Sequence, residues 1–305
     1  MKMNSIGMNN ELDSRLEAAQ ATVDTHYEEG RQDGWFKTRH PLVLKAFDEL
    51  DNYLVIDDGR STGWCCVYFS SNSIYYPSDE ATFRKEILEK NRFEFFGTRL
   101  HRCSRHIFVR DIHKQWYLRG INGRLNSIEK VAAFLKEATE GYRVITLGSS
   151  AGGYAAALFA TLLGGEYSIC VDAQFNLYDD NIFGHLERNP IVDEQKDSDQ
   201  SKYYRLNDIL GPVPVYYFCS ALSAWDQRSM AAVRDNPAVR LIPFKSDKHG
   251  GPFSSMLYEH VFDMPQAKLE KLVGRMHHPR LFLLRHLLNK PTLRKLWARL
   301  RKRFF

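Results

Sequence analysis

The sequence has no long hydrophobic run. Nowhere in its 305 residues do 18 apolar residues follow one another, which excludes an ordinary membrane-spanning helix. The first twenty residues contain no apolar stretch of signal-peptide length, and they carry acidic residues early. We therefore expect a cytoplasmic protein.

Cysteine is scarce. The five cysteines are odd in number, scattered, and without metal-ligand spacing: Cys65, Cys66, Cys103, Cys170 and Cys219. Cysteine-based zinc sites and secreted disulfide frameworks both use cysteines at regular spacings, so neither is expected. We expect reduced, mostly buried thiols and no metal site.

Acidic residues are nearly missing from the C-terminal end. Residues 266–305 hold 12 Lys and Arg against a single acid, Glu270. The remaining 265 residues hold 30 bases and 36 acids, so the net charge of +5 comes from the tail alone. No nucleic-acid reader motif accompanies this charge, and we expect no nucleic-acid partner.

What the chain does have is an alternation of strand and helix patterns, with 44% apolar and 26% charged residues to build a core. Apolar runs of β-forming residues predict strands at 53–56, 64–70, 106–110, 143–147, 168–172, 213–219 and 239–244. Helical spacing of apolar residues predicts helices at 128–138 and 153–163. The alternation predicts an α/β fold, with a mainly parallel sheet and helices on both faces.

Helical patterns also flank this α/β region, at 9–33 and 41–50 before it and from about 253 to the end after it. The chain then divides into three parts: an N-terminal helical extension (1–50), an α/β domain (51–265) and a basic helical tail (266–305). Within the domain, residues 176–210 are polar and rich in acids. We interpret them as an insertion and a candidate cap over a site.

The strongest local motif is Gly148-Ser149-Ser150-Ala151-Gly152, a G-x-S-x-G pattern. A β-forming run ends directly before it and a helix of small residues begins directly after it, which is the strand–turn–helix setting of a nucleophile elbow. Glycine neighbours allow the sharp turn and the close approach of the helix. Ser150 is therefore the candidate nucleophile of an α/β-hydrolase type of fold. The alternative is a glycine-rich turn, such as a phosphate-binding loop.

A serine nucleophile needs a base, and the base needs an acid that orients it. In this fold the acid and the histidine follow the serine in that order, each in a loop after a strand. Asp226 follows the strand at 213–219, and His249 follows the strand at 239–244. Asp247 and Asp172 are rival acids. Asp247 is only two residues from His249, and Asp172 ends the strand after the nucleophile.

An oxyanion hole needs two hydrogen-bond donors. The backbone N–H of Ala151, directly after the nucleophile, is the first candidate. The second is expected from the loop after an early strand, where Ser70 or Ser71 could donate through its N–H. An ordinary β-turn at this place is the alternative.

These residues suggest a family. The resemblance lies in Val67–Ser71, in the pattern Arg110, Asp111, Trp116, Tyr117 and Gly120, and in 145–156 (ITLGSSAGGYAA). Over about residues 50–255 the chain resembles α/β-hydrolase-like proteins encoded with bacterial surface-polysaccharide genes, and most of all capsule O-acetyltransferases. The resemblance implies a triad of Ser150, Asp226 and His249, an acetyl donor such as acetyl-CoA, and a polysaccharide acceptor. Where members often carry Phe-Ser-Pro-Gln-Thr, this chain has Val171–Phe175, which leaves the acceptor open.

Aromatic and basic residues outside the motif suggest binding surfaces. Arg110, Trp116 and Tyr117 are candidates for the acceptor site because sugar rings stack on aromatic side chains. Packing at the domain edge explains the Trp–Tyr pair equally well. Near the C-terminus, apolar residues form one helical stripe among six basic ones: Leu293, Leu296, Trp297, Leu300 and Phe304. Residues 292–305 therefore suit an anionic membrane surface or a polyanion, or else the stripe docks on the protein's own core.

Three functions remain open. The first is acyl transfer, with acetyl-CoA as donor and a surface polysaccharide as acceptor, through an acyl-Ser150 intermediate in a cytoplasmic enzyme that also binds the inner face of the membrane. The second is an esterase that uses the same residues, with water as acceptor. The third is a non-catalytic polysaccharide-assembly protein.

Overall fold

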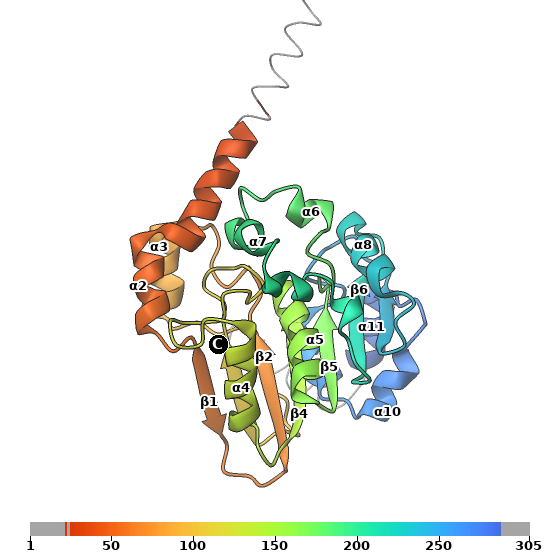
Figure 1. Ribbon diagram of the computed structural model, residues 1–305. Coiled ribbons are helices and arrows are strands. Elements are labelled where there is room, and N and C mark those ends of the chain that lie inside the picture. Colours follow the sequence, from red (N-terminus) through yellow and green to blue (C-terminus); the bar gives the residue numbers. More distant parts are fainter. Residues whose placement is uncertain (1–21, 23–24, 288–305) are drawn as a thin grey trace, which may run out of the picture.

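The computed structural model describes residue 22 and residues 25–287, and a seven-stranded sheet forms its centre (Figure 1). The strands are β1 (Tyr53–Asp57), β2 (Trp64–Phe69), β3 (Arg105–Val109), β4 (Arg143–Ser149), β5 (Tyr167–Val171), β6 (Val215–Ser220) and β7 (Val239–Phe244). They lie in the order β1-β3-β2-β4-β5-β6-β7. Only β1 runs antiparallel to its neighbour, whereas every other adjacent pair is parallel. The predicted mainly parallel α/β sheet is confirmed.

Both faces of the sheet are covered, and the side chains of β2 show how. Cys65 and Val67 are buried in the core on one face, and Cys66 and Tyr68 in the core on the other. Since neither face of this strand meets water, its sequence is a continuous apolar run and not an alternation of apolar and polar residues.

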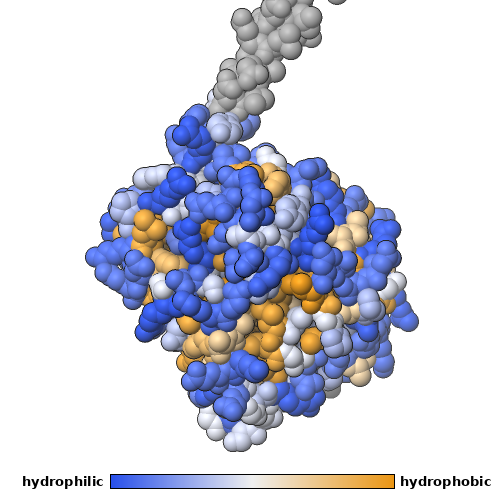
Figure 2. All heavy atoms as spheres, in the orientation of Figure 1, coloured by the Kyte–Doolittle hydropathy of each residue, from blue (hydrophilic) through white to orange (hydrophobic). Residues whose placement is uncertain are grey.

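The helices divide between the two faces (Figure 1). One face carries α4 (Ile128–Ala138) and α5 (Ala151–Leu163). The other carries η4 (Ser255–Leu257), α9 (Tyr258–Phe262), α10 (Gln266–Leu269), η5 (Glu270–Leu272) and α11 (Pro279–Leu287). Leu269 and Phe282 are buried in that second core, so residues 266–287 pack on the domain. Figure 2 shows mostly hydrophilic residues on the first face, with hydrophobic ones gathered over α5.

The N-terminal helices pack on one side of the domain. Residues 25–39 are helical, and α2 (Pro41–Glu49) follows after His40, whose Nδ1 accepts a hydrogen bond from the Leu42 N–H. The first helix thus ends at residue 39 and not at the expected residue 33. A Cβ on Gly34 would lie 2.1 Å from the Glu187 carbonyl oxygen, so this glycine allows close packing inside the helix. Residues 80–89 form α3 (Glu80–Phe83) and η1 (Arg84–Glu89), which the sequence did not predict.

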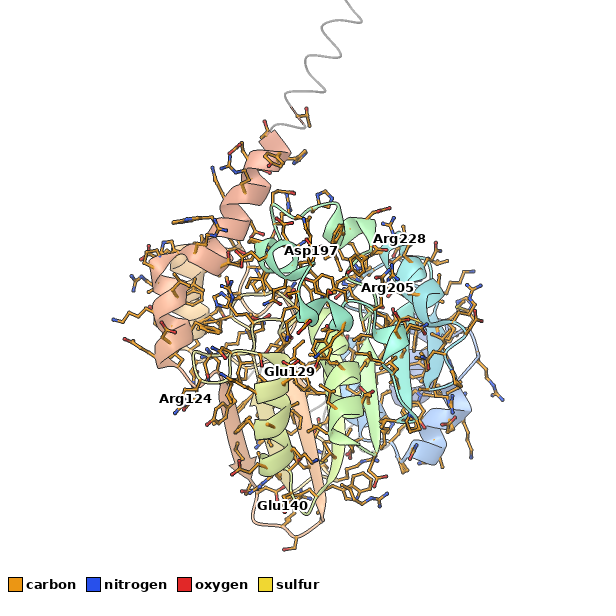
Figure 3. All side chains as sticks on the ribbon, viewed as in Figure 1. Arg124, Glu129, Glu140, Asp197, Arg205 and Arg228 are labelled. Carbon is orange, nitrogen blue, oxygen red and sulfur yellow. The ribbon has the colours of Figure 1, made fainter. Side chains whose placement is uncertain are left out.

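Residues 176–210 lie over the carboxyl ends of the central strands (Figure 1). They form α6 (Asp180–Phe183), α7 (Pro190–Gln195), η2 (Asp199–Tyr203) and η3 (Leu206–Asp208). Ile191 and Tyr204 are buried in the core shared with α5. Glu129 of α4 accepts a hydrogen bond from the Tyr203 hydroxyl at 2.9 Å, and Arg228 of α8 (Ala224–Val233) pairs with Asp179 at 3.4 Å. Figure 3 labels Glu129 and Arg228 on the two helices. The segment is therefore tied to the domain on two sides.

Among the described helices, none has the length and apolar character needed to cross a bilayer.

Candidate active site

Ser150 lies on a sharp turn between β4 and α5. Its backbone has φ 54° and ψ −121°, a conformation that residues with a Cβ rarely adopt. Two glycines make the turn possible. A Cβ on Gly148 would lie 2.0 Å from the Gly152 carbonyl oxygen, and a Cβ on Gly152 would lie 2.3 Å from the carbonyl oxygen of Phe69. The G-x-S-x-G spacing therefore places the serine hydroxyl at the N-terminus of α5 and at the end of β2.

The structure brings Ser150, His249 and Asp226 together. Nε2 of His249 lies 3.1 Å from the Ser150 Oγ, and its Nδ1 lies 2.9 Å from the Asp226 Oδ1. These distances connect the hydroxyl to the carboxylate through one imidazole ring. Both contacts lie within the range for hydrogen bonds between a nucleophile, its base and the acid that orients it.

Adjacent strands position these three side chains. β4 ends at Ser149, β6 ends at Ser220 before α8, and β7 ends at Phe244 before the His249 loop. Asp226 lies in the first turn of α8, capped by Ser223, and is fully buried. Because neighbouring parallel strands end at the same edge of a sheet, segments about 100 residues apart in the chain meet here. Asp247, one of the rival acids, is exposed.

Asp172, the other rival, is buried beside this group and is bonded elsewhere. Its Oδ1 accepts the Ser220 N–H at 2.7 Å, and its Oδ2 lies 3.1 Å from the Ser220 Oγ. The Ser220 hydroxyl donates its single proton to the Lys248 carbonyl at 2.7 Å. Burial and the nearby charge of Asp226 raise the pKa of Asp172 to about 7.

The two carboxylates also raise the pKa of His249. Burial lowers the pKa of His249, but the hydrogen bond from its ring to Asp226 and the charges of Asp226 and Asp172 raise it more, so the pKa lies above its ordinary value of 6.5. Asp226 Oδ2 is buried and accepts no hydrogen bond from any described residue.

The same three groups are also close enough to be tested as a metal site. Donor atoms of Asp172, Asp226 and His249 lie within 4.8 Å of one another. A metal bound at Nδ1 of His249 would replace the bond to Asp226, and one carboxylate is already committed to Ser220. Hydrogen bonding alone accounts for the arrangement, and we assign no metal-binding role to it.

The expected oxyanion donors are only partly free. Ala151, Gly152 and Gly153 form the first turn of α5, and the first hydrogen bond of that turn runs from the Tyr154 N–H to the Ser150 carbonyl. The Ala151 N–H therefore points out of the helix end, as required. The expectation for the second donor needs correction, because neither Ser70 nor Ser71 has a free N–H. The Ser70 N–H donates to the Val109 carbonyl at 3.0 Å, and the Ser71 N–H donates to the Glu94 carboxylate at 2.8 Å.

The structure also corrects the expected acceptor-binding residues, which are buried. Arg110 is 1% exposed and bonds to the Asn52 Oδ1 and the Arg92 carbonyl. Tyr117 is fully buried, and its hydroxyl donates to the Ser70 carbonyl. Trp116 is 4% exposed, and its indole N–H donates to the Gln174 Oε1 at 3.2 Å. All three are too buried for an acceptor to stack on them.

Two residues beside Ser150 are not among the predicted site residues. Gln174 Nε2 lies 3.0 Å from the Ser150 Oγ and 3.4 Å from the His249 Nε2. Trp225 is part-exposed, and its ring centroid lies 5.5 Å from that of His249. Their positions in the sequence could have identified them, since Gln174 follows β5 and Trp225 precedes Asp226 at the same edge of the sheet. Residues 292–305, expected to bind a membrane, lie outside the described residues.

Comparison with known proteins identifies the fold of this chain. The chain matches no protein-family model, and no curated protein matches its sequence. A solved structure of the capsule O-acetyltransferase of Neisseria meningitidis serogroup A is similar, with a TM-score of 0.50 and 13% identity over 73% of this chain and 92% of that one. The fold is that of the α/β-hydrolases.

Two further solved structures are more distant. A mutant of the same Neisseria meningitidis enzyme in complex with CoA has a TM-score of 0.47 and 11% identity over 72% of this chain and 98% of that one. Carboxyl esterase 2 from the mycorrhizal fungus Tuber melanosporum has a TM-score of 0.42 and 11% identity over 73% of this chain and 81% of that one.

Proposed function

We propose that this protein is a serine acyltransferase that moves an acetyl group from acetyl-CoA to a hydroxyl of a bacterial surface polysaccharide. The observation that carries the proposal is the hydrogen-bonded line from Ser150 through His249 to Asp226, set on a strained turn at the N-terminus of a helix. The likeness in fold to a capsule O-acetyltransferase supports the choice of reaction.

The reaction proceeds in two halves. His249 Nε2 takes the proton of the Ser150 hydroxyl while Oγ attacks the thioester carbonyl, and the tetrahedral intermediate collapses as the sulfur leaves with that proton. The acetyl group is then bound to Oγ as an ester. In the second half His249 takes the proton of the acceptor hydroxyl, whose oxygen attacks the ester, and returns the proton to Ser150. Asp226 stabilises the positive imidazole in both halves.

A basic cavity next to the histidine loop supports CoA as the donor. This cavity of about 710 Å³ is lined by Lys245, Lys248 and one acid, Asp247, from the chain around His249, and by Arg280 of α11, so basic side chains outnumber acidic ones. Within the described residues none of these three cations is paired with an acid. Phosphate groups on a donor would find opposite charge there. The matching test compares acetyl-CoA with acetyl-pantetheine, which lacks the nucleotide phosphates. Replacing Lys248 by alanine should raise KM for the first donor and leave KM for the second unchanged.

Trp225 supports a sugar acceptor. It is an aromatic side chain that is part-exposed and next to His249, and aromatic faces stack on sugar rings. Residues 292–305 fit a further role in the proposal, holding the enzyme at an anionic membrane surface where surface polymers are assembled.

The decisive experiment is mass spectrometry of the intact protein after incubation with acetyl-CoA. Wild-type protein should gain one acetyl group and Ser150→Ala none. CoA release should then accelerate in the presence of the correct unacetylated polymer, because a bound and oriented hydroxyl outcompetes water. If no polymer in a capsular panel accelerates CoA release while simple acetate esters are cleaved rapidly, the protein is an esterase. If Ser150 neither acetylates nor reacts with a fluorophosphonate, the protein is not a serine enzyme.

A further inference from the structure

The tetrahedral intermediate of the proposed reaction carries a negative oxygen that needs two hydrogen-bond donors. One is the Ala151 N–H, but the neighbouring amides at the end of β2 are occupied, that of Ser70 by Val109 and that of Ser71 by Glu94. We infer that the side-chain amide of Gln174 is the second oxyanion donor. This inference rests on the proposed serine chemistry and adds a catalytic residue to it.

The orientation of the Gln174 amide follows from its neighbour. An indole N–H can only donate, so the atom of Gln174 that lies 3.2 Å from the Trp116 Nε1 must be the carbonyl oxygen. Both ends of the amide lie near the Ser150 Oγ, and the NH2 group is the nearer one, at 3.0 Å against 3.5 Å for the carbonyl oxygen. Trp116 therefore acts as a positioning residue that fixes which end of the amide meets the nucleophile.

Several hydrogen bonds fix the turn that carries Trp116. Trp116 is buried, and the turn that holds it is built around the carboxylate of Asp111, which accepts the N–H groups of His113, Gln115 and Tyr117. The Tyr117 hydroxyl bonds to the Ser70 carbonyl and so ties this turn to the end of β2. A donor held in this way needs little rearrangement when charge develops in front of it.

Gln174 also lies where a donor is needed. β5 pairs with β4 in the register Ser149 with Val171, so the loop after β5 begins beside the nucleophile elbow. Gln174 is 3% exposed, so water does not compete strongly for its N–H groups. In the resting site one N–H donates to the Ser150 Oγ. When Oγ bonds to the acyl carbon, the carbonyl oxygen that becomes negative lies one bond further on, within reach of the same NH2 group.

The test uses the rate at which a fluorophosphonate labels Ser150. In this reaction the Oγ–P bond forms as the P–F bond breaks, and the phosphoryl oxygen occupies the oxyanion position. Gln174→Ala and the isosteric Gln174→Glu, which has no donor when ionised, should slow labelling and lower kcat about 10²- to 10³-fold, with KM for an aryl acetate nearly unchanged. Trp116→Phe should slow both by a smaller factor. Combined with Gln174→Ala it should add nothing, because its effect acts through that amide.

Glu94→Ala tests the competing arrangement, in which Glu94 moves away and frees the Ser71 N–H. We expect it to leave labelling near the wild-type rate. Labelling of Gln174→Ala and Gln174→Glu at the wild-type rate, in proteins with the wild-type melting temperature, would overturn the inference. An increase in Glu94→Ala would then identify Ser71 as the donor. Absence of labelling in the wild type would instead overturn the proposed serine chemistry, so the two failures are distinguishable.

Discussion

Replacing Asp226 by asparagine removes the charge beside His249 and leaves the shape of the side chain nearly unchanged. In the transition state His249 becomes positive while Asp226 Oδ1 lies 2.9 Å from its Nδ1. Two unit charges whose centres are about 4 Å apart attract each other by about 4 kcal/mol at an effective dielectric constant of about 20. Since each ~1.4 kcal/mol is a factor of ten in rate, Asp226→Asn should lower kcat about 10³-fold. An asparagine that turns its NH2 group to Nδ1 would also fix the wrong tautomer and add to the loss.

The assay is the pre-steady-state release of CoA, followed with a thiol reagent, together with the melting temperature. The melting temperature checks that the variant is folded, because the new NH2 group replaces either Oδ1, which bonds to His249, or the buried Oδ2, which has no partner among the described residues. The control is Asp247→Asn, an exposed position on the same loop as His249, which should keep the wild-type rate with an aryl acetate, a substrate without phosphates for the cavity that Asp247 lines. If Asp226→Asn stays near wild type and Asp247→Asn is inactive, the assignment of the acid is wrong.

Three further expectations follow from the same site. The pKa of Asp172 is about 7 in the folded protein, against 3.8 for a free carboxyl. Between these two pH values the folded state binds more protons than the unfolded state, so the free energy of unfolding falls as the pH rises from 3.8 to 7. Asp172→Asn keeps the bonds to Ser220, so the melting temperature of this variant should exceed that of the wild type by an amount that grows from pH 4 to pH 8. A difference in melting temperature that stays constant over this range would show that the carboxyl stays ionised. Because His249 must be neutral to accept a proton and its pKa lies above 6.5, kcat/KM should rise with pH to a midpoint above that value, and a lower midpoint would contradict the raised pKa. Deleting residues 292–305 should abolish co-sedimentation with anionic vesicles while aryl acetate hydrolysis continues, and vesicle binding that survives the deletion would refute the proposed membrane role.

Much of the fold could be predicted because its signals are local. A strand covered on both faces is a continuous apolar run, and a helix on a sheet shows its spacing, so the strand over Trp64–Phe69 and the helix over Ile128–Ala138 stand out in the sequence. The N-terminal helix continues past its predicted end at residue 33, and Gly34 lies inside it, where its missing Cβ leaves room for the Glu187 carbonyl. That contact joins residues far apart in the chain, so the local sequence pattern does not show it.

In the site, too, some residues could be predicted from the sequence and others could not. Ser150, Asp226 and His249 could be proposed together because each follows a strand and their order along the chain is fixed by the topology of the fold. The occupied N–H of Ser71 could not be predicted, since its partner is a side chain 23 residues away in sequence. Nor does the sequence reveal whether an aromatic pair is buried, so the choice between an acceptor site and packing stayed open for Trp116 until its burial and its bond to Gln174 were seen.

The strained backbone conformation of Ser150 has a consequence for the evolution of the sequence. Glycine adopts the conformation at φ 54° and ψ −121° freely, whereas a residue with a Cβ loses about 1–3 kcal/mol there. A domain has only about 5–15 kcal/mol of stability in total, so selection for folding alone would favour glycine at this position. A protein that merely bound polysaccharide would gain stability by losing the hydroxyl. The serine found here is therefore an argument for use of that hydroxyl, and glycine at the same turn would mark a relative in which catalysis has been lost.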